Sequence, residues 1–155
     1  KMHIKSLKAT LLVDFVKLEI IDIHCTMTRK HDSKIVLPFT KHHRLRVLCG
    51  DMGYDDCKVR RTLRSRGIRP LIPHREFMNK QKYWNSLMDK GLYHKRSLCE
   101  TVNSVIKRKY TDTLYSKDWR DQFKEMILLA IVYNIDRRIR VLIEVFYKAE
   151  SIRYQ

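Results

Sequence analysis

The pattern of apolar and polar residues predicts a β-hairpin at the start of the chain. Residues 7–13 are apolar and rich in side chains that favour strands, and residues 19–27 alternate between apolar and polar positions. Only a short connection separates the two segments, which is typical of antiparallel neighbours. We therefore expect these two strands to pair.

Short strands and helices are expected to alternate in the next part of the chain. The expected elements are a helix at 34–41, a strand at 45–49, a helix at 57–66 and a strand at 68–72. Residues 31–33 can cap the first helix, and Asp55 and Asp56 can cap the second. Gly67 stands where a helix often ends, and Pro70 favours an edge or an end of the last strand.

The second half of the chain predicts helices. Residues 73–92 are irregular and polar, with aromatic side chains interleaved among basic ones. Residues 98–110 form one amphipathic helix, and residues 118–149 form a longer one whose apolar positions recur every three to four residues. The resulting order (strand, strand, helix, strand, helix, strand, helix, helix) indicates an α/β fold.

The composition fits one domain with a basic surface. The chain has 155 residues, of which 44% are hydrophobic, enough to bury a core without disulfides or a structural metal. Lys and Arg number 33 against 17 Asp and Glu, which gives a net charge of +16. Residues 51–110 alone carry 15 basic and 6 acidic residues. An excess of this size predicts a polyanion as the partner.

Targeting segments and a cysteine framework are not expected. The most apolar stretch, residues 126–132, is too short to cross a bilayer, and nothing resembles a signal peptide. Four cysteines at positions 25, 49, 57 and 99 form no Cys-x-x-Cys pair. Scattered thiols of this kind fit a reducing cytoplasm better than a disulfide frame or a zinc site.

Asp51 is the first candidate for chemistry. It directly follows the strand expected at 45–49, at the edge where open α/β sheets bind their ligands. From local sequence alone, however, a simple turn aspartate in Gly-Asp-Met-Gly is the favoured interpretation.

The helix that begins near Ser97 carries a second set of candidates. Arg96, Glu100, Asn103 and Lys107 form a polar stripe opposite its apolar face. Two structural interpretations compete with a functional one. Ser97 and Glu100 match a capping box, and the basic residues around Lys107 can simply complement the helix dipole.

The spacing of this stripe matches a known signature. The pattern resembles the Tyr-Arg-Glu-Lys signature of insertion-sequence DDE transposases. It consists of Tyr93, Arg96, Glu100 and Lys107, separated by two, three and six residues. Further blocks resemble that family in the same order, at residues 31–34, 50–55, 69–76 and 133–137. The resemblance runs from about residue 7 to residue 138.

The resemblance implies a ribonuclease-H-like domain, with a mixed sheet flanked by helices, that cuts and rejoins DNA. In that family three carboxylates hold two divalent ions, Mg²⁺ or Mn²⁺, which activate the attacking oxygen and stabilise the leaving one. Asp51 is then the second and Glu100 the third of these catalytic, metal-binding carboxylates. The DNA-binding candidates are Tyr93, Arg96, Asn103 and Lys107.

The chain departs from the family pattern at its start. The family's first aspartate lies on its first strand, in an Asp-Ser/Ala-Thr-Gly type of motif that has no counterpart here. Asp14 resembles the end of the second strand instead, and four strands are found where the family core needs five. We therefore expect the C-terminal part of a transposase that lacks the first strand. Residues 1–138 are the truncated catalytic domain, and residues 139–155 are a helical extension.

Three functions remain open from the sequence. The first is a transposase fragment that acts on transposon terminal repeats by lineage and is inactive alone because one carboxylate is absent. The second is a non-catalytic, basic DNA-binding remnant, supported by the charge of residues 51–110 and the aromatic, basic stretch 77–84. The third is a basic domain for RNA contact, which no RNA-binding signature supports. The resemblance also implies a prokaryotic, cytoplasmic, nucleoid-associated protein without a membrane, and pairing of two copies would suit the joining of two DNA ends.

Overall fold

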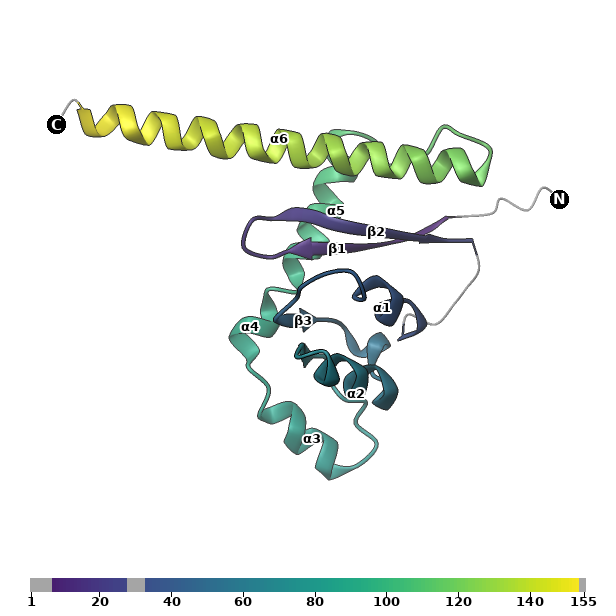
Figure 1. Ribbon diagram of the computed structural model, residues 1–155. Coiled ribbons are helices and arrows are strands. Elements are labelled where there is room, and N and C mark those ends of the chain that lie inside the picture. Colours follow the sequence, from purple (N-terminus) through teal and green to yellow (C-terminus); the bar gives the residue numbers. More distant parts are fainter. Residues whose placement is uncertain (1–6, 28–32, 154–155) are drawn as a thin grey trace.

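The computed structural model describes residues 7–27 and 33–153 (Figure 1). Its elements are β1 (Lys8–Asp14), β2 (Glu19–Thr26), α1 (Ser33–Phe39), β3 (Val47–Cys49), the 3-10 turn η1 (Met52–Tyr54), α2 (Cys57–Ser65), β4 (Arg69–Leu71), α3 (Asn79–Ser86), α4 (Lys90–His94), α5 (Ser97–Lys109) and α6 (Trp119–Arg153). This order of strands and helices is that of an α/β protein, as predicted.

The first two strands form the predicted antiparallel hairpin. Asp14 closes its turn, because its Oδ1 accepts hydrogen bonds from the amides of Val16 and Lys17 at 2.8 and 3.1 Å. Leu18 takes the left-handed conformation with φ of 59°, which reverses the chain into β2. Asp14 is therefore a turn residue.

The second pair of strands forms a separate sheet. β3 runs parallel to β4, and within the described ranges no hydrogen-bonded ladder joins this pair to the hairpin. The family resemblance implies one mixed sheet, whereas residues 7–27 and 33–153 form two small ones. The α/β class stands, and the ribonuclease-H-like arrangement stays a prediction.

Each sheet has its own hydrophobic cluster. The hairpin packs on α5 and α6 through Ile20, Val102, Ile106, Ala130 and Tyr133. The β3–β4 pair packs with α1 and α2 through Val36, Val59, Leu63, Ile68 and Ile72. Figure 1 shows these two halves one above the other, with β1 and β3 facing the space between them. The two packed halves contact each other through β2 and the α1 region, where His24 packs on Phe39 and His43 bonds to Asp22, and a cavity separates β1 from β3.

The helix ends follow the sequence with one correction. Asp56 caps α2, since its carboxylate accepts hydrogen bonds from the amides of Lys58 and Val59. Gly67 ends that helix with φ of +72°, a conformation that glycine adopts without strain. The prediction that Asp55 shares the capping role is wrong, because Asp55 binds Arg60 instead. Residues 31 and 32, which were expected to cap α1, lie outside the described residues.

The expectation of an irregular segment at 73–92 is also wrong in part, because it contains α3 and α4. Both helices lack buried residues, so the sequence has no hydrophobic periodicity that would predict them. Side chains at their starts hold them instead: Gln81 Oε1 accepts from the amides of Phe77 and Met78, and Asp89 Oδ1 accepts from the amide of Leu92. Local capping thus replaces burial in this stretch.

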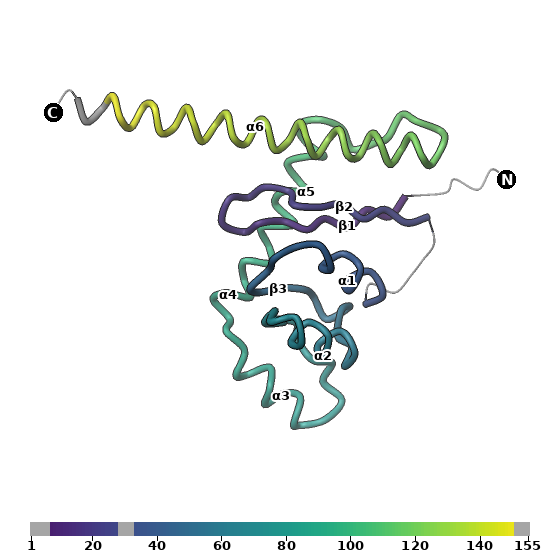
Figure 2. The backbone as a smooth tube through the Cα atoms, in the orientation of Figure 1, coloured from purple at the N-terminus to yellow at the C-terminus, as the bar shows by residue number. Residues whose placement is uncertain are grey.

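The last helix is the longest element. α6 has 35 residues and runs past the closed end of the hairpin, which the backbone trace shows clearly (Figure 2). Neither α6 nor any other helix in the described ranges is apolar over enough residues to cross a membrane.

Candidate active site

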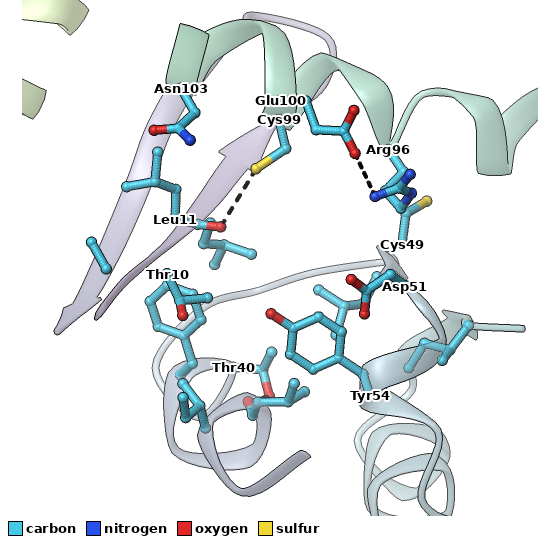
Figure 3. Close-up of a pocket in the computed structure, with 18 of the residues that line it drawn as sticks. Thr10, Leu11, Thr40, Cys49, Asp51, Tyr54, Arg96, Cys99, Glu100 and Asn103 are labelled. Carbon is cyan, nitrogen blue, oxygen red and sulfur yellow. Dashed lines mark hydrogen bonds and ion pairs between the residues drawn. The ribbon is translucent and has the colours of Figure 1, made fainter. Parts of the chain in front are cut away.

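A cavity of about 300 Å³ opens between the hairpin and the β3–β4 half (Figure 3). β1, α1, the end of β3 and α5 all contribute to its wall. Four residues predicted for the site line it: Asp51, Arg96, Glu100 and Asn103. The sequence therefore identified residues from two distant segments that the fold brings to one cavity.

Asp51 lies at the exit of β3, as predicted. Its backbone is extended, with φ of −77° and ψ of 176°, and its Oδ1 accepts a hydrogen bond from the amide of Gly53 at 2.9 Å. The preceding Gly50 is held close to the neighbouring strand, where its amide donates to the carbonyl of Leu71 at 3.1 Å. A Cβ on Gly50 would lie 3.1 Å from Tyr54 Cδ2, so a small residue is favoured there. The turn interpretation and the site interpretation of Asp51 are thus compatible.

Glu100 extends from the first turn of α5 and forms an ion pair with Arg96. Arg96 Nη1 donates to Glu100 Oε1 at 2.7 Å, one helical turn away. The capping-box interpretation of Glu100 is wrong, because Ser97 Oγ donates to the carbonyl of His94 at 2.8 Å. No side chain caps α5 at all. The Glu100 carboxylate therefore has no capping role, and its partner at the cavity is Arg96.

Arg96 sits in the field of both carboxylates. Burial alone lowers the pKa of Arg96, but the negative charge of Glu100 and its hydrogen bond outweigh this, so the pKa is raised. Tyr93 and Asp51 act on Arg96 in the same direction. Figure 3 shows the guanidinium between Glu100 on α5 and Asp51 at the end of β3. One cation thus lies between the two candidate ligands, paired with Glu100 (Figure 3).

The remaining candidates are less tightly grouped. Asn103 lines the cavity one turn beyond Glu100 and is exposed. Tyr93 lies half-buried on α4, close enough to Arg96 to affect its pKa, with its ring centroid 6.5 Å from that of His94. Lys107 is exposed about 10 Å further along α5 than Glu100, at 1.5 Å per residue, and does not line this cavity.

Other carboxylates near these segments are used structurally. Asp55 accepts hydrogen bonds from Arg60 Nε and Nη2 at 2.9 and 2.7 Å and from the amide of Arg75 at 2.8 Å. Burial would raise the pKa of Asp55, but these donors together lower it. Asp14 is used in the hairpin turn. In the part of the chain that the structure describes, no three His, Cys, Asp or Glu side chains come together as a metal-binding group.

Tyr54 and Cys99 are among the cavity residues that were not predicted from the sequence. Tyr54 forms part of the cavity floor, and Cys99 Sγ donates to the carbonyl of Leu11 at 3.8 Å. Burial raises the pKa of the Cys99 thiol, as does Glu100, so this group is a neutral hydrogen-bond donor. The position of Cys99 next to Glu100 in the sequence was the one available signal.

Comparison with known proteins identifies the family of the chain. A family described as Transposase DDE domain matches residues 1–135. No curated protein and no solved structure matches the chain. Because the family match covers most of its length, the chain belongs to the transposase DDE domain family.

Proposed function

We propose that the chain is the C-terminal portion of a transposase catalytic domain of the Tyr-Arg-Glu-Lys type. Its lineage performs metal-dependent cleavage and transfer of DNA strands at transposon terminal repeats, at the nucleoid of a prokaryotic cell. One observation carries the proposal: Asp51 and Glu100, 49 positions apart in the sequence, line one cavity around Arg96. The family and the basic charge support DNA as the partner.

The described residues supply only some of the ligands of the metal site proposed for this lineage. Two divalent ions, when bound, stabilise the attacking and leaving oxygens of a phosphoryl transfer. Asp51 and Glu100 would be two of their three carboxylate ligands. Asp55 and Asp14 do not line this cavity and are held by structural hydrogen bonds, so we assign neither as the third. The described residues therefore do not complete the site, and we propose that this chain does not cleave DNA by itself.

The backbone supports the proposal that one strand is lacking between β1 and β3. On β3, the carbonyl of Arg46 and the amide of Gly50 bond to β4. In a parallel pair alternate residues point to opposite sides, so Val47 and Cys49 present their backbone groups to the cavity side. On β1, the carbonyl of Leu11 accepts a hydrogen bond from the Cys99 thiol rather than from the backbone of a neighbouring strand.

The shape of the open space supports the same proposal. Every residue of β1 lines this cavity or a second one beside β3: residues 8–12 line the first, and residues 11–14, with the first turn residues, line the second. Because successive side chains of a strand point to opposite faces, such a run marks the edge of the strand rather than one face. A single strand in this space would join both sheets into one mixed sheet, and it could bring the first carboxylate beside Asp51.

The cleavage experiment uses the 155-residue chain, Mg²⁺ or Mn²⁺, and duplexes that carry terminal repeats. We expect salt-sensitive DNA binding without strand cleavage. Cleavage that Glu100→Gln abolishes, and that Glu144→Gln on the far helix leaves intact, would show that the site is complete and would contradict the inactivity. Failure to bind any duplex at low salt would contradict DNA as the partner.

A non-catalytic DNA-binding remnant is the second candidate function. It is favoured by α3 and the residues before it, where Phe77 and Tyr83 are 79% and 62% exposed. Lys80 Nζ lies 5.0 Å from the centre of the Trp84 ring. Exposed aromatic and basic side chains together suit stacking and phosphate contact. Metal titration separates the two candidates, because Asp51→Asn and Glu100→Gln should weaken Mn²⁺ binding only if the pair is a ligand site.

A further inference from the structure

Helix α6 has two apolar faces on opposite sides. One face packs on the hairpin: Ala130 and Tyr133 are 7% and 6% exposed, and Asn134 bonds to the backbone of Ile20. The other face consists of residues whose exposed fraction lies between 46% and 68%. They are Leu128, Val132, Ile135, Ile139, Leu142 and Phe146. We call this second set the heptad stripe.

The spacing of the heptad stripe is regular. Its members follow one another at intervals of four, three, four, three and four residues. At 100° per residue they fall within an arc of about 80°, centred opposite the face that packs on the hairpin. The stripe is about 27 Å long at 1.5 Å per residue. Apolar residues at alternating intervals of three and four are the pattern of a coiled-coil seam.

The C-terminal half of α6 has no other packing partner among the described residues. Every residue from 138 to 150 is exposed, and Figure 1 shows this part of the helix extending beyond the hairpin. An isolated helix of this length is marginally stable in water, because most helical stability in proteins comes from packing. A contiguous exposed apolar stripe also marks an interaction surface.

We propose that the heptad stripe pairs with the same stripe of a second copy, in a parallel two-stranded coiled coil. A heptad seam is complementary to itself, so the same residues on two copies interdigitate around a two-fold axis. The first core position holds Val132, Ile139 and Phe146, two of which are β-branched, and the second holds Leu128, Ile135 and Leu142, two of which are leucines. β-branched residues at the first core position and leucine at the second favour two parallel strands.

The fold leaves room for this pairing along the C-terminal part of α6. The hairpin lies on the opposite side of α6, and the connection between α5 and α6 contacts only its start, at Gln122 and Glu125 (Figure 1). Residues 138–150 are all exposed. Two charged residues flank the stripe, and both are already paired within the chain. Arg138 bonds to Glu19, and Asp136 bonds to Lys109 and Arg140. The margins of the stripe therefore do not bring uncompensated like charges together. This inference does not depend on the proposed DNA chemistry.

The test compares two neighbouring substitutions in the 155-residue chain. Leu142→Glu places a carboxylate in the stripe, whereas Val141→Glu places the same group on the opposite, also exposed face. We expect the wild type and Val141→Glu to sediment as dimers and Leu142→Glu to be monomeric, with a dissociation constant raised at least about 100-fold. Circular dichroism should show all three to be folded, because both positions are exposed.

Two results would overturn the proposal. One is a wild type that stays monomeric at every concentration, which would mean that something other than a second copy covers the stripe. The other is an equal effect of both substitutions, which would place the contact elsewhere on the chain.

Disulfide formation tests the parallel direction. Leu142→Cys, in a chain whose exposed Cys57 is replaced by serine, should form a linked dimer under mild oxidation, because equivalent core positions meet only in a parallel pair. Val141→Cys should not. A dimer that persists without this crosslink would refute the parallel arrangement.

Discussion

The side chain of Asn134 holds the hairpin onto α6, and its removal gives the sharpest stability prediction. Asn134 Oδ1 accepts from the amide of Ile20 at 2.8 Å, and Asn134 Nδ2 donates to the carbonyl of the same residue at 2.9 Å. Ile20 is only 6% exposed. The carboxamide thus satisfies the outer edge of β2 in the way that a neighbouring strand would.

Asn134→Ala leaves both backbone groups of Ile20 without their partner. Each unsatisfied, mostly buried group costs about 1–3 kcal/mol, and some water can reach this edge, so we expect a loss of about 2–3 kcal/mol in the free energy of unfolding. For a chain of this size that corresponds to a fall in Tm of about 4–12 °C. Tyr133→Phe removes a single donor, the hydroxyl that bonds to the carbonyl of Leu18 at 3.0 Å, and should cost about 1 kcal/mol.

Urea unfolding followed by circular dichroism measures these differences. Asn103→Ala serves as the control, since Asn103 is an exposed helical asparagine and its loss should change stability by less than about 0.5 kcal/mol. The reasoning is refuted if Asn134→Ala unfolds at the same urea concentration as the control. Asn134→Leu, which keeps the volume and loses the polar atoms, should be destabilised to a similar degree.

Three further outcomes are expected. Asp55→Asn should destabilise the fold at neutral pH, and the difference from wild type should shrink in acid. The folded-state pKa of Asp55 lies below its ordinary 3.8, so its contribution is present above 3.8 and is lost as the pH falls through the folded value; unfolding curves across this range measure it. Arg96→Gln removes the cation beside Asp51 and Glu100 and should tighten Mn²⁺ binding about 3–10-fold in a spin-resonance titration, whereas unchanged affinity would mean that the pair is not a ligand site. If Lys107 contacts a phosphate, Lys107→Gln should lower the slope of log affinity against log salt concentration by about one unit. The control Lys117→Gln should leave this slope unchanged, and an equal slope for both variants and the wild type would contradict the contact.

The sequence predicted the elements best where burial imposes a period. The hairpin and the start and length of α5 follow from alternation and from helical spacing. α3 and α4 were missed because their residues are exposed and local capping holds them. The pairing of Asp55 with Arg60 was missed for a related reason: two adjacent aspartates look alike in sequence, and only the fold decides which one caps the helix.

The candidate site was predicted through spacing rather than through local chemistry. No local feature distinguishes Asp51 from an ordinary turn residue, and Glu100 matched a capping box that the structure does not form. The block at 133–137 has a structural role that the sequence alone does not reveal. Its Tyr133, Asn134 and Arg137 all bond to the backbone at residues 17–20, the turn end of the hairpin.

The arrangement of the two hydrophobic clusters explains why the site depends on what fills the space between them. Arg96 and Glu100 belong to the half built on the hairpin, α5 and α6, whereas Asp51 belongs to the half built on β3, α1 and α2. The distance between the two carboxylates is therefore set by how the halves meet, not by either core. A strand bonded to both β1 and β3 would fix that distance through two backbone ladders, and phosphoryl transfer depends on such fixed positions. Under the proposed function, a strand that joins the two sheets would therefore also set the spacing of the proposed metal ligands.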